Sequence, residues 1–310
     1  MSRLALALLV LAALAAGVPA QDPSAGVSQR VLEIDAVPLD RDGNVLTDIR
    51  RDEVEVWIEH YRIPIETFIA ITPDDERARR SVVLLLDDIT IHPSDAARVR
   101  DVARRFVNRL GPADQMAIIG LNGAASRSTS DRAELLRSID AYNPVATGPI
   151  RPDDLSAHVL TALTSISRQV TESPARRRTI VAIGPGWLFD TPIPPPSVGR
   201  DVRAEWTEAV RAMALANVTL YVIDPGGVGA SRVSGGENGF ARETGGYSFS
   251  NTNDMDRAAE RIMHEAVSYY ILRIADPPMF RKDVLRGVDV RILRRSATIR
   301  AARYLAGPAR

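Results

Sequence analysis

The chain has 310 residues, of which 45% are hydrophobic, and its 39 basic and 39 acidic side chains balance to a formal net charge of zero. Such a chain can bury one large core, or one core and a smaller companion. The balanced charge predicts no general attraction to nucleic acid or to anionic membranes. The absence of cysteine excludes thiol catalysis, thiolate metal sites and disulfides, and a single lysine, Lys282, excludes a P-loop.

The first 20 residues have the pattern of a secretory signal peptide. Arg3 supplies a positive charge, residues 4–17 are apolar, and small residues precede a cleavage position after Ala20. The alternative is an uncleaved anchor, but an apolar stretch of about 14 residues is short for a bilayer span of about 20. We therefore expect export to the periplasm or the exterior, with no membrane span after cleavage. Residues 21–30 are polar and predict a disordered lead-in.

Two β-rich segments flank the middle of the chain. Residues 31–72 alternate between apolar and polar side chains around an Asp-Gly turn signal at Gly43, and residues 73–80 form a charged linker. Residues 268–310 are again extended in pattern. We hypothesise that the two β segments pair into one small accessory β unit, with residues 54–58 lying against residues 288–292.

The middle of the chain is organised around residues 82–86, VVLLL, which end abruptly in Asp87 and Asp88. An apolar run without alternation is typical of a strand buried on both faces of a parallel sheet. A buried helix segment would look the same, but the β-branched start and the polar stop favour a strand. Strands and helices alternate from 81 to 267, which predicts a Rossmann-like α/β domain with a mainly parallel sheet.

The other elements expected in this domain follow from hydrophobic periodicity and from Gly and Pro stops. Strands are expected at 116–121, 179–184, 218–224 and 247–249, with a short edge strand at 126–130. Helices are expected at 93–110, 131–140, 153–171, 200–216, 237–243 and 254–267.

The carboxyl ends of the strands are the expected binding edge, because ligands of open α/β sheets bind there. Asp88, Thr90 and His92 follow the first strand, and the loop after 179–184 carries Trp187 and Phe189. Aromatic side chains presented on a loop are typical anchors for a protein partner. The equally weighted alternative is that the two aromatic residues fold back into a small satellite core.

Three stretches in the second half of the chain are jointly distinctive: LYVIDPGGV (220–228), FARETGGYSFSNTNDMDRA (240–258) and SYYILRIADP (268–277). Together they resemble the bacterial von Willebrand factor A-related (VWFA-related) domain family of exported proteins. Residues 40–68 are similar to the lead-in of that family, and Arg303-Tyr304 is similar to its closing motif. The resemblance covers nearly the whole mature length. It implies a von Willebrand A domain, which commonly binds protein partners through a metal-ion-dependent adhesion site.

The adhesion-site motif is degenerate in this sequence. The family pattern has Asp-x-Ser-x-Ser after the first strand, and counting from Asp87 places Ile89 and Ile91 at the two serine positions. Counting instead from Asp88 gives a threonine and a histidine. Pro185 stands where the pattern has an aspartate after a later strand.

A divalent cation is therefore expected to bind weakly at most. Mg²⁺ keeps several waters and needs only one or two protein carboxylates, so the candidate ligands are Asp87, Asp88, Thr90 and Thr147. The alternative, which we weight more heavily, is that Asp87 or Asp88 caps the following loop by accepting backbone N–H bonds.

No motif pairs a nucleophile with a base. The histidines are scattered along the chain, and His264-Glu265 lacks the second histidine of a zincin. We therefore interpret the chain as a non-catalytic module that recognises an unidentified protein partner. The alternatives are an exported metal-assisted hydrolase and a structural component of the envelope with a vestigial site.

Overall fold

The computed structural model describes residues 31–76, 78–145, 150–171, 173–185, 201–229, 239–276 and 285–306. The expected signal peptide and lead-in, together with Thr147, Trp187 and Phe189, lie outside these residues.

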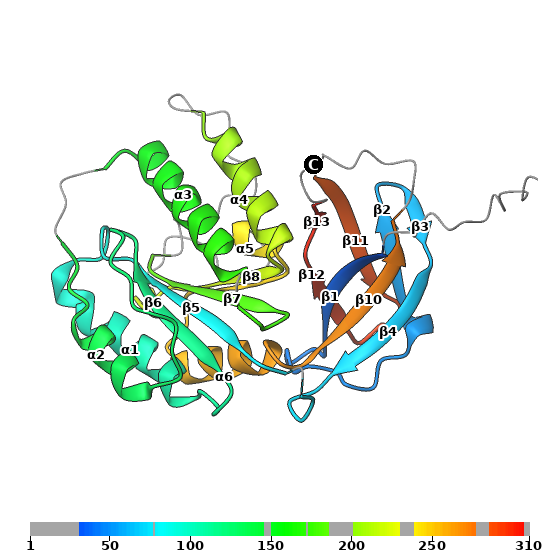
Figure 1. The fold of residues 1–310 in the computed structure, drawn as a ribbon, viewed down its shortest axis with the longest axis horizontal. Helices are drawn as coiled ribbons and strands as arrows, with labels where there is room; N and C mark the ends of the chain where they lie inside the picture. Colours follow the sequence, from blue (N-terminus) through cyan, green and yellow to red (C-terminus); the bar gives the residue numbers. More distant parts are fainter. Residues whose placement is uncertain are drawn as a thin grey trace, which may run out of the picture. The chain divides into compact units, whose positions relative to one another are not determined.

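The predicted strand at 82–86 is β5 (Ser81–Leu86), and all six of its residues are buried. It pairs in parallel with β6 (Gln115–Gly120) on one side and with β7 (Arg178–Ile183) on the other. Next to β7 lies β8 (Val218–Ile223), and β9 (Ser248–Phe249) pairs with β8 to complete a five-stranded parallel sheet (Figure 1). The prediction of an α/β fold with an internal, apolar strand at this position is confirmed.

Helices cover both faces of this sheet. Successive side chains of β5 point to opposite faces, so Leu84 and Leu86 join one hydrophobic cluster while Val83 and Leu85 join another. Helices α1, α2 and α6 pack on the first face, and α3 and α4 on the second (Figure 1). The helices are α1 (Ala96–Asn108), α2 (Arg132–Asp140), α3 (Pro152–Val170), α4 (Arg203–Leu215), α5 (Phe240–Glu243) and α6 (Met255–Glu265), with 3-10 turns η1 (Arg51–Glu53) and η2 (Pro93–Asp95).

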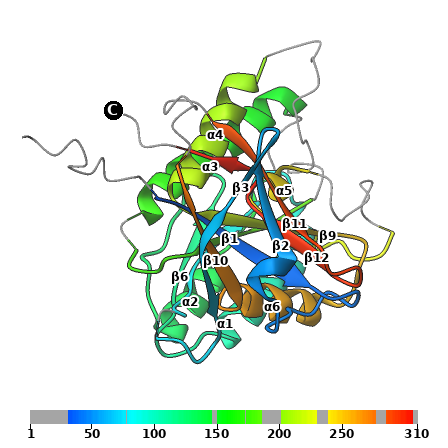
Figure 2. The ribbon, with the colours of Figure 1, turned by 90° about the vertical axis from the view of Figure 1, so that its right-hand side faces the viewer.

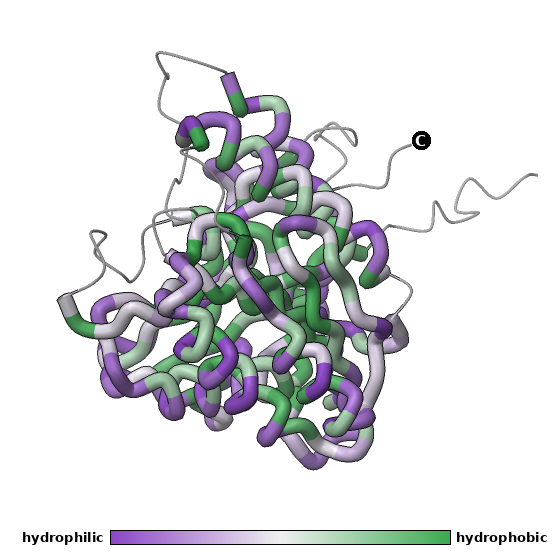
Figure 3. Tube along the Cα trace, turned by 90° about the vertical axis from the view of Figure 1, so that its left-hand side faces the viewer, coloured by the Kyte–Doolittle hydropathy of each residue, from purple (hydrophilic) through white to green (hydrophobic). Residues whose placement is uncertain are grey.

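The hydrophobic stretches gather in the interior and the hydrophilic stretches lie mainly outside (Figure 3). No helix in the described part of the chain combines the length and the apolar character that crossing a membrane requires.

The prediction of an edge strand at 126–130 is wrong. The segment makes only isolated antiparallel bridges beside β6, between Ile119 and Ala125 and between Met116 and Thr129. The physical reason is at Ser126, whose hydroxyl accepts the N–H of Ile118 at 2.8 Å. A side chain therefore occupies the place of a backbone carbonyl, and the ladder is interrupted there.

Strands from both ends of the chain form the accessory β unit, as expected (Figure 2). Residue by residue, the hypothesis for 54–58 and 288–292 is confirmed, because Val288 lies opposite Ile58 and Ile292 opposite Val54. The unit holds two four-stranded antiparallel sheets, ordered β12-β1-β10-β4 and β13-β11-β2-β3. Its strands are β1 (Val31–Leu39), β2 (Val54–Ile58), β3 (Tyr61–Ile63), β4 (Ile65–Ile71), β10 (Tyr269–Ala275), β11 (Arg286–Ile292), β12 (Thr298–Ala301) and β13 (Tyr304–Leu305).

The two antiparallel sheets bury one common core. Ile34 and Leu272 from the first sheet and Val56 from the second belong to the same buried cluster. Such packing of inner faces is the arrangement of a β-sandwich. The accessory unit is thus larger than the sequence suggested.

The Thr-Gly-Gly motif at 244–246 forms a junction between the main sheet and the C-terminal strands. The hydroxyl of Thr244 accepts the N–H of Leu220 in β8 at 2.9 Å. Gly245 has φ +79°, and a Cβ there would lie 2.7 Å from the backbone carbon of Ala301 in β12. A Cβ on Gly246 would overlap the carbonyl oxygen of Leu220. Only glycine fits both positions, which gives this part of the family-like motif a structural role.

Gly246→Ala is therefore expected to destabilise the protein by about 1–3 kcal/mol or more, as overpacking against fixed backbone does. The control is Gly287→Ala in β11, where a Cβ meets nothing within 4 Å. The free energy of unfolding measured in urea separates the two variants. Equal stability of both variants would contradict this account of the motif.

Candidate functional site

Asp87 and Asp88 leave the carboxyl end of β5 with both side chains buried, at 1% and 4% exposure. Consecutive residues of an extended chain point in opposite directions. Asp87 faces the end of β7, where a Cβ on Gly184 would lie 2.7 Å from its own Cβ. Asp88 faces the end of β6, where a Cβ on Gly120 would collide with its Oδ2. Each carboxylate therefore fits because a glycine lies at that position, Gly184 directly after β7 and Gly120 as the last residue of β6.

The carboxylate of Asp87 is used within its own loop. Its Oδ1 accepts the backbone N–H of Ile89 at 3.0 Å and of Thr90 at 2.8 Å, and its Oδ2 accepts the hydroxyl of Thr90. Burial raises the pKa of Asp87 against the opposing effect of these hydrogen bonds. The geometry is that of the loop cap considered above as the alternative to a metal ligand.

The carboxylate of Asp88 accepts hydrogen bonds from backbone N–H groups. Its Oδ1 accepts the backbone N–H of Asn122 at 3.0 Å, and the backbone N–H groups of Leu121 and of Asp88 itself also act on the carboxylate. Burial raises the pKa of Asp88, and the charge of Asp87 acts in the same direction.

The loop after α2 is hydrogen-bonded to the backbone carbonyl oxygens of the two aspartates. The hydroxyl of Tyr142 donates to the carbonyl oxygen of Asp87 at 2.6 Å. The N–H of Val145 donates to the carbonyl oxygen of Asp88 at 2.9 Å. These bonds hold residues 142–145 at the carboxyl edge of the sheet, next to the end of β5.

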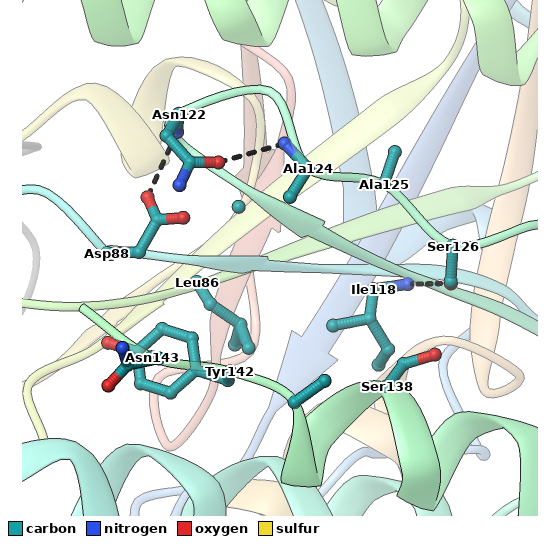
Figure 4. A pocket seen from close by; sticks show the side chains of 12 residues that line it. Leu86, Asp88, Ile118, Asn122, Ala124, Ala125, Ser126, Ser138, Tyr142 and Asn143 are labelled. Atoms are coloured by element: carbon teal, nitrogen blue, oxygen red, sulfur yellow. Dashed lines mark hydrogen bonds between the residues drawn. The ribbon is translucent and has the colours of Figure 1, made fainter. Parts of the chain in front are cut away.

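A cavity of about 270 Å³ lies beside Asp88, between the loop after β6 and the end of α2 (Figure 4). Asp88 and Asn122 stand at one end of it, with Ser126 and Ser138 at the other. The side chains of Leu86, Ile118 and Tyr142 contribute apolar surface between these ends.

Of the other residues expected at this edge, Thr90 is half-buried and bonded to Asp87, as described above. His92 is exposed, and its Nδ1 accepts the N–H of Ser94 at the start of η2. The structure thus brings Asp87, Asp88 and Thr90 together. It says nothing of Thr147, Trp187 and Phe189, which lie outside the described residues.

Most carboxylate oxygens of the two aspartates already accept hydrogen bonds from described residues. Both oxygens of Asp87 accept hydrogen bonds within the loop, and Oδ1 of Asp88 accepts one from Asn122. Within the described ranges, no group of three or more histidine, aspartate or glutamate side chains is placed to hold a metal ion. A weakly bound divalent cation at Asp87, Asp88, Thr90 and Thr147 stays a prediction.

Sequence reasoning missed Asn122, Tyr142 and Val145. Asn122 had a usable signal, because Asn-Gly directly after a predicted strand marks a turn at the binding edge. Tyr142 had none, since it lies 55 residues from Asp87 in the chain and no motif joins the two.

Comparison with known proteins finds similarity at the level of solved structures. No family model matches the chain, and no curated protein matches it. An aerotolerance-related membrane protein from Bacteroides fragilis is 16% identical over 60% of this chain and 98% of its own, with a TM-score of 0.41. The von Willebrand factor domain of a type V pili tip protein from Porphyromonas gingivalis is 15% identical over 38% of this chain and 39% of its own, with a TM-score of 0.27.

A minor pilin from Streptococcus sanguinis is 11% identical over 60% of each chain, with a TM-score of 0.37. The chain thus spans less than two thirds of the two pilus proteins. One of these structures is thus described as a von Willebrand factor domain.

The buried charge of Asp87 generates a prediction about pH. A raised pKa means that the folded state favours the neutral carboxyl group. Its contribution to stability is therefore full below the ordinary value of 3.8 and is lost as the pH rises through the raised pKa. Asp87→Asn keeps an acceptor for the N–H groups of Ile89 and Thr90 and removes the charge. At pH 7 we expect it to be at least as stable as the wild type, with an advantage that shrinks towards about pH 4.

Asp87→Ala removes the acceptor and should cost about 1–3 kcal/mol at pH 7. Asp131→Asn is the control for the substitution itself, because Asp131 also accepts two backbone N–H groups but is exposed. Urea unfolding at several pH values measures all four proteins. An Asn variant as unstable as the Ala variant would show that the charge itself is needed.

Proposed function

We propose that the protein is an exported, non-catalytic binding module that recognises a protein partner through the carboxyl edge of its parallel sheet. The observation that carries the proposal is apolar exposure at this edge. Val145 is 55% exposed in the loop next to β5, and Val228 is 63% exposed in the loop after β8. Burying such side chains against a partner is favourable, by about 1.5–3 kcal/mol for each fully buried residue.

Both valines are held in place by hydrogen bonds of their own backbone. The N–H of Val145 is bonded to Asp88, and the N–H of Val228 donates to Oδ1 of Asn253 at 3.1 Å. Groups that are already ordered lose little conformational entropy on binding. One strand, β7, separates β5 from β8, so the carboxyl ends of these two strands, next to which the two loops lie, are about 10 Å apart. A single partner surface can therefore cover both.

The described contacts give less support to the alternative of a metal-assisted hydrolase. Near this edge, His158 bonds the carbonyl oxygen of Leu121 through Nε2 at 2.7 Å, and His92 is paired with Ser94. Neither contact sets up a nucleophile and a base. The alternative of a structural component with a vestigial edge makes a different prediction, because the exposed valines would then be dispensable for binding.

The export part of the proposal rests on the signal-peptide pattern of residues 1–20. It implies that the partner is met outside the cytoplasm, so the envelope fraction of the native cells is the material in which to seek it.

Val145→Asp with Val228→Asp should abolish partner capture. The matched control is Leu215→Asp, because Leu215 is 45% exposed at the end of α4, directly before β8 and hence at the opposite edge of the sheet. Immobilised chain from residue 21 onwards is used to capture proteins from the envelope fraction, and each captured protein is identified and its affinity measured. We expect a loss of at least about tenfold in affinity for each valine replaced.

The protein that qualifies as partner is one retained by the wild type and by Leu215→Asp but not by the double variant. Circular dichroism confirms that each variant is folded. Capture that survives in the double variant, or that is lost equally in Leu215→Asp, would rule out the carboxyl edge as the binding surface.

A further inference from the structure

The cavity beside Asp88 is lined by a buried carboxylate that forms no ion pair with any described arginine. Asp88 is 4% exposed and lines the cavity, and the hydrogen bonds that its carboxylate accepts from described residues come from backbone N–H groups. A buried charge that lacks a partner is costly, and an opposite charge with hydrogen-bond donors offsets that cost. The chemistry of this end of the cavity therefore favours a cationic group.

The surroundings of the cavity have the same electrostatic character. Ser138 and Ala141, at the carboxyl end of the nine-residue helix α2, form part of the wall. The carbonyl groups at a helix carboxyl end carry partial negative charge, which favours cations. The nearby Arg100 donates to the carbonyl oxygen of Tyr142 at 3.0 Å and does not line the cavity.

The shape of the cavity suits a long side chain with a charged head. Leu86, Ile118 and the ring of Tyr142 offer apolar surface along it, which matches the methylene stem of lysine or arginine. A volume of about 270 Å³ has room for one such side chain. A wholly apolar group would leave Asp88 unpaired, and an anion would be repelled.

Exposed residues border the cavity, so it is accessible to a partner. Asn122, Ala125 and Asn143 line it and are exposed. Asn143 lies two residues before Val145, which the proposed function places in the interface. A partner that covers Val145 is thus in position to reach the cavity.

We infer that the cavity receives an arginine or lysine side chain of the protein partner, with the cationic head on Oδ2 of Asp88 and the stem along Leu86 and Ile118. The inference rests on the proposed function and specifies the chemistry of the partner. Oδ1 of Asp88 keeps its bond from Asn122, because a carboxylate has about four acceptor positions.

The test uses small probes of the two side chains. Protein labelled with ¹⁵N is titrated with N-acetyl-arginine methylamide, N-acetyl-lysine methylamide and the neutral N-acetyl-norleucine methylamide. The amide of Asn122 is the reporter, because it donates to Asp88. We expect saturable shifts with the cationic probes and at least about tenfold weaker binding of the neutral one, since hydrogen bonds to charged groups contribute about 1.5–3 kcal/mol. The tighter of the two cationic probes identifies the side chain.

Two variants change residues at opposite ends of the cavity. Asp88→Asn removes the charge, and Ser138→Leu fills space at the other end, so both should weaken the cationic probes about tenfold or more. Asp224→Asn is the matched control. Asp224 is likewise buried at the carboxyl edge and accepts a backbone N–H, from Gly226 at 2.9 Å, but it does not line the cavity. It should leave probe binding unchanged.

Equal binding of the neutral probe, or unchanged binding in Asp88→Asn, would overturn the inference. So would Mg²⁺ that shifts the Asn122 amide saturably and excludes the probes, because the cavity would then hold a metal ion. Using Asp88→Asn as the bait in the capture experiment separates the two proposals. If Asp88→Asn retains the partner that the double valine variant loses, the inference of a cationic side chain in the cavity is wrong. The proposed function of the carboxyl edge is then still supported. If the valine variant retains the partner, the proposed function itself fails.

Discussion

The arrangement of this edge depends on the burial of two adjacent carboxylates at the end of one internal strand. Desolvation opposes burial of a charged group, so the surrounding chain must supply hydrogen bonds at fixed positions. Asp87 and Asp88 receive them from backbone N–H groups of their own loop and of the loop after β6. Gly120 at the end of β6 and Gly184 directly after β7 leave the space in which these side chains lie. Burial of the two carboxylates therefore requires this strand order, these loop conformations and these glycines together.

The same constraint gives the two aspartates different tasks. Asp87 points towards β7 and uses both oxygens to fix the loop that follows, so its contribution is to local structure. Asp88 points towards β6 and fixes a neighbouring loop with one oxygen, while the other faces a cavity. Through their carbonyl oxygens both also hold the loop that carries Val145. The two aspartates thus both hold the exposed Val145 in place and give the cavity its acidic character.

Periodicity in the sequence was enough to predict β5, the parallel sheet and the pairing of residues 54–58 with 288–292, because each rests on hydrophobic patterning that burial requires. It was not enough to assign roles to the two aspartates. Those roles depend on Asn122 and Tyr142, which lie 34 and 55 residues away from them in the chain. The strand expected at 126–130 failed for a related reason, since one serine hydroxyl replaced a backbone acceptor. Contacts of this kind leave no period in a sequence.

The accessory β-sandwich bears on function through where it attaches. Asp35 of β1 pairs with Arg176, which precedes β7, at 2.8 Å, and accepts the side-chain amide of Asn217, which precedes β8, also at 2.8 Å. Both contacts lie at the amino ends of the parallel strands. Asp35 is nearly buried there, with 5% of its side chain exposed. These contacts engage the sandwich with the amino edge of the sheet, whereas Val145 and Val228 at the carboxyl edge remain exposed. A partner that binds the carboxyl edge therefore does not compete with Asp35 for the amino ends of β7 and β8.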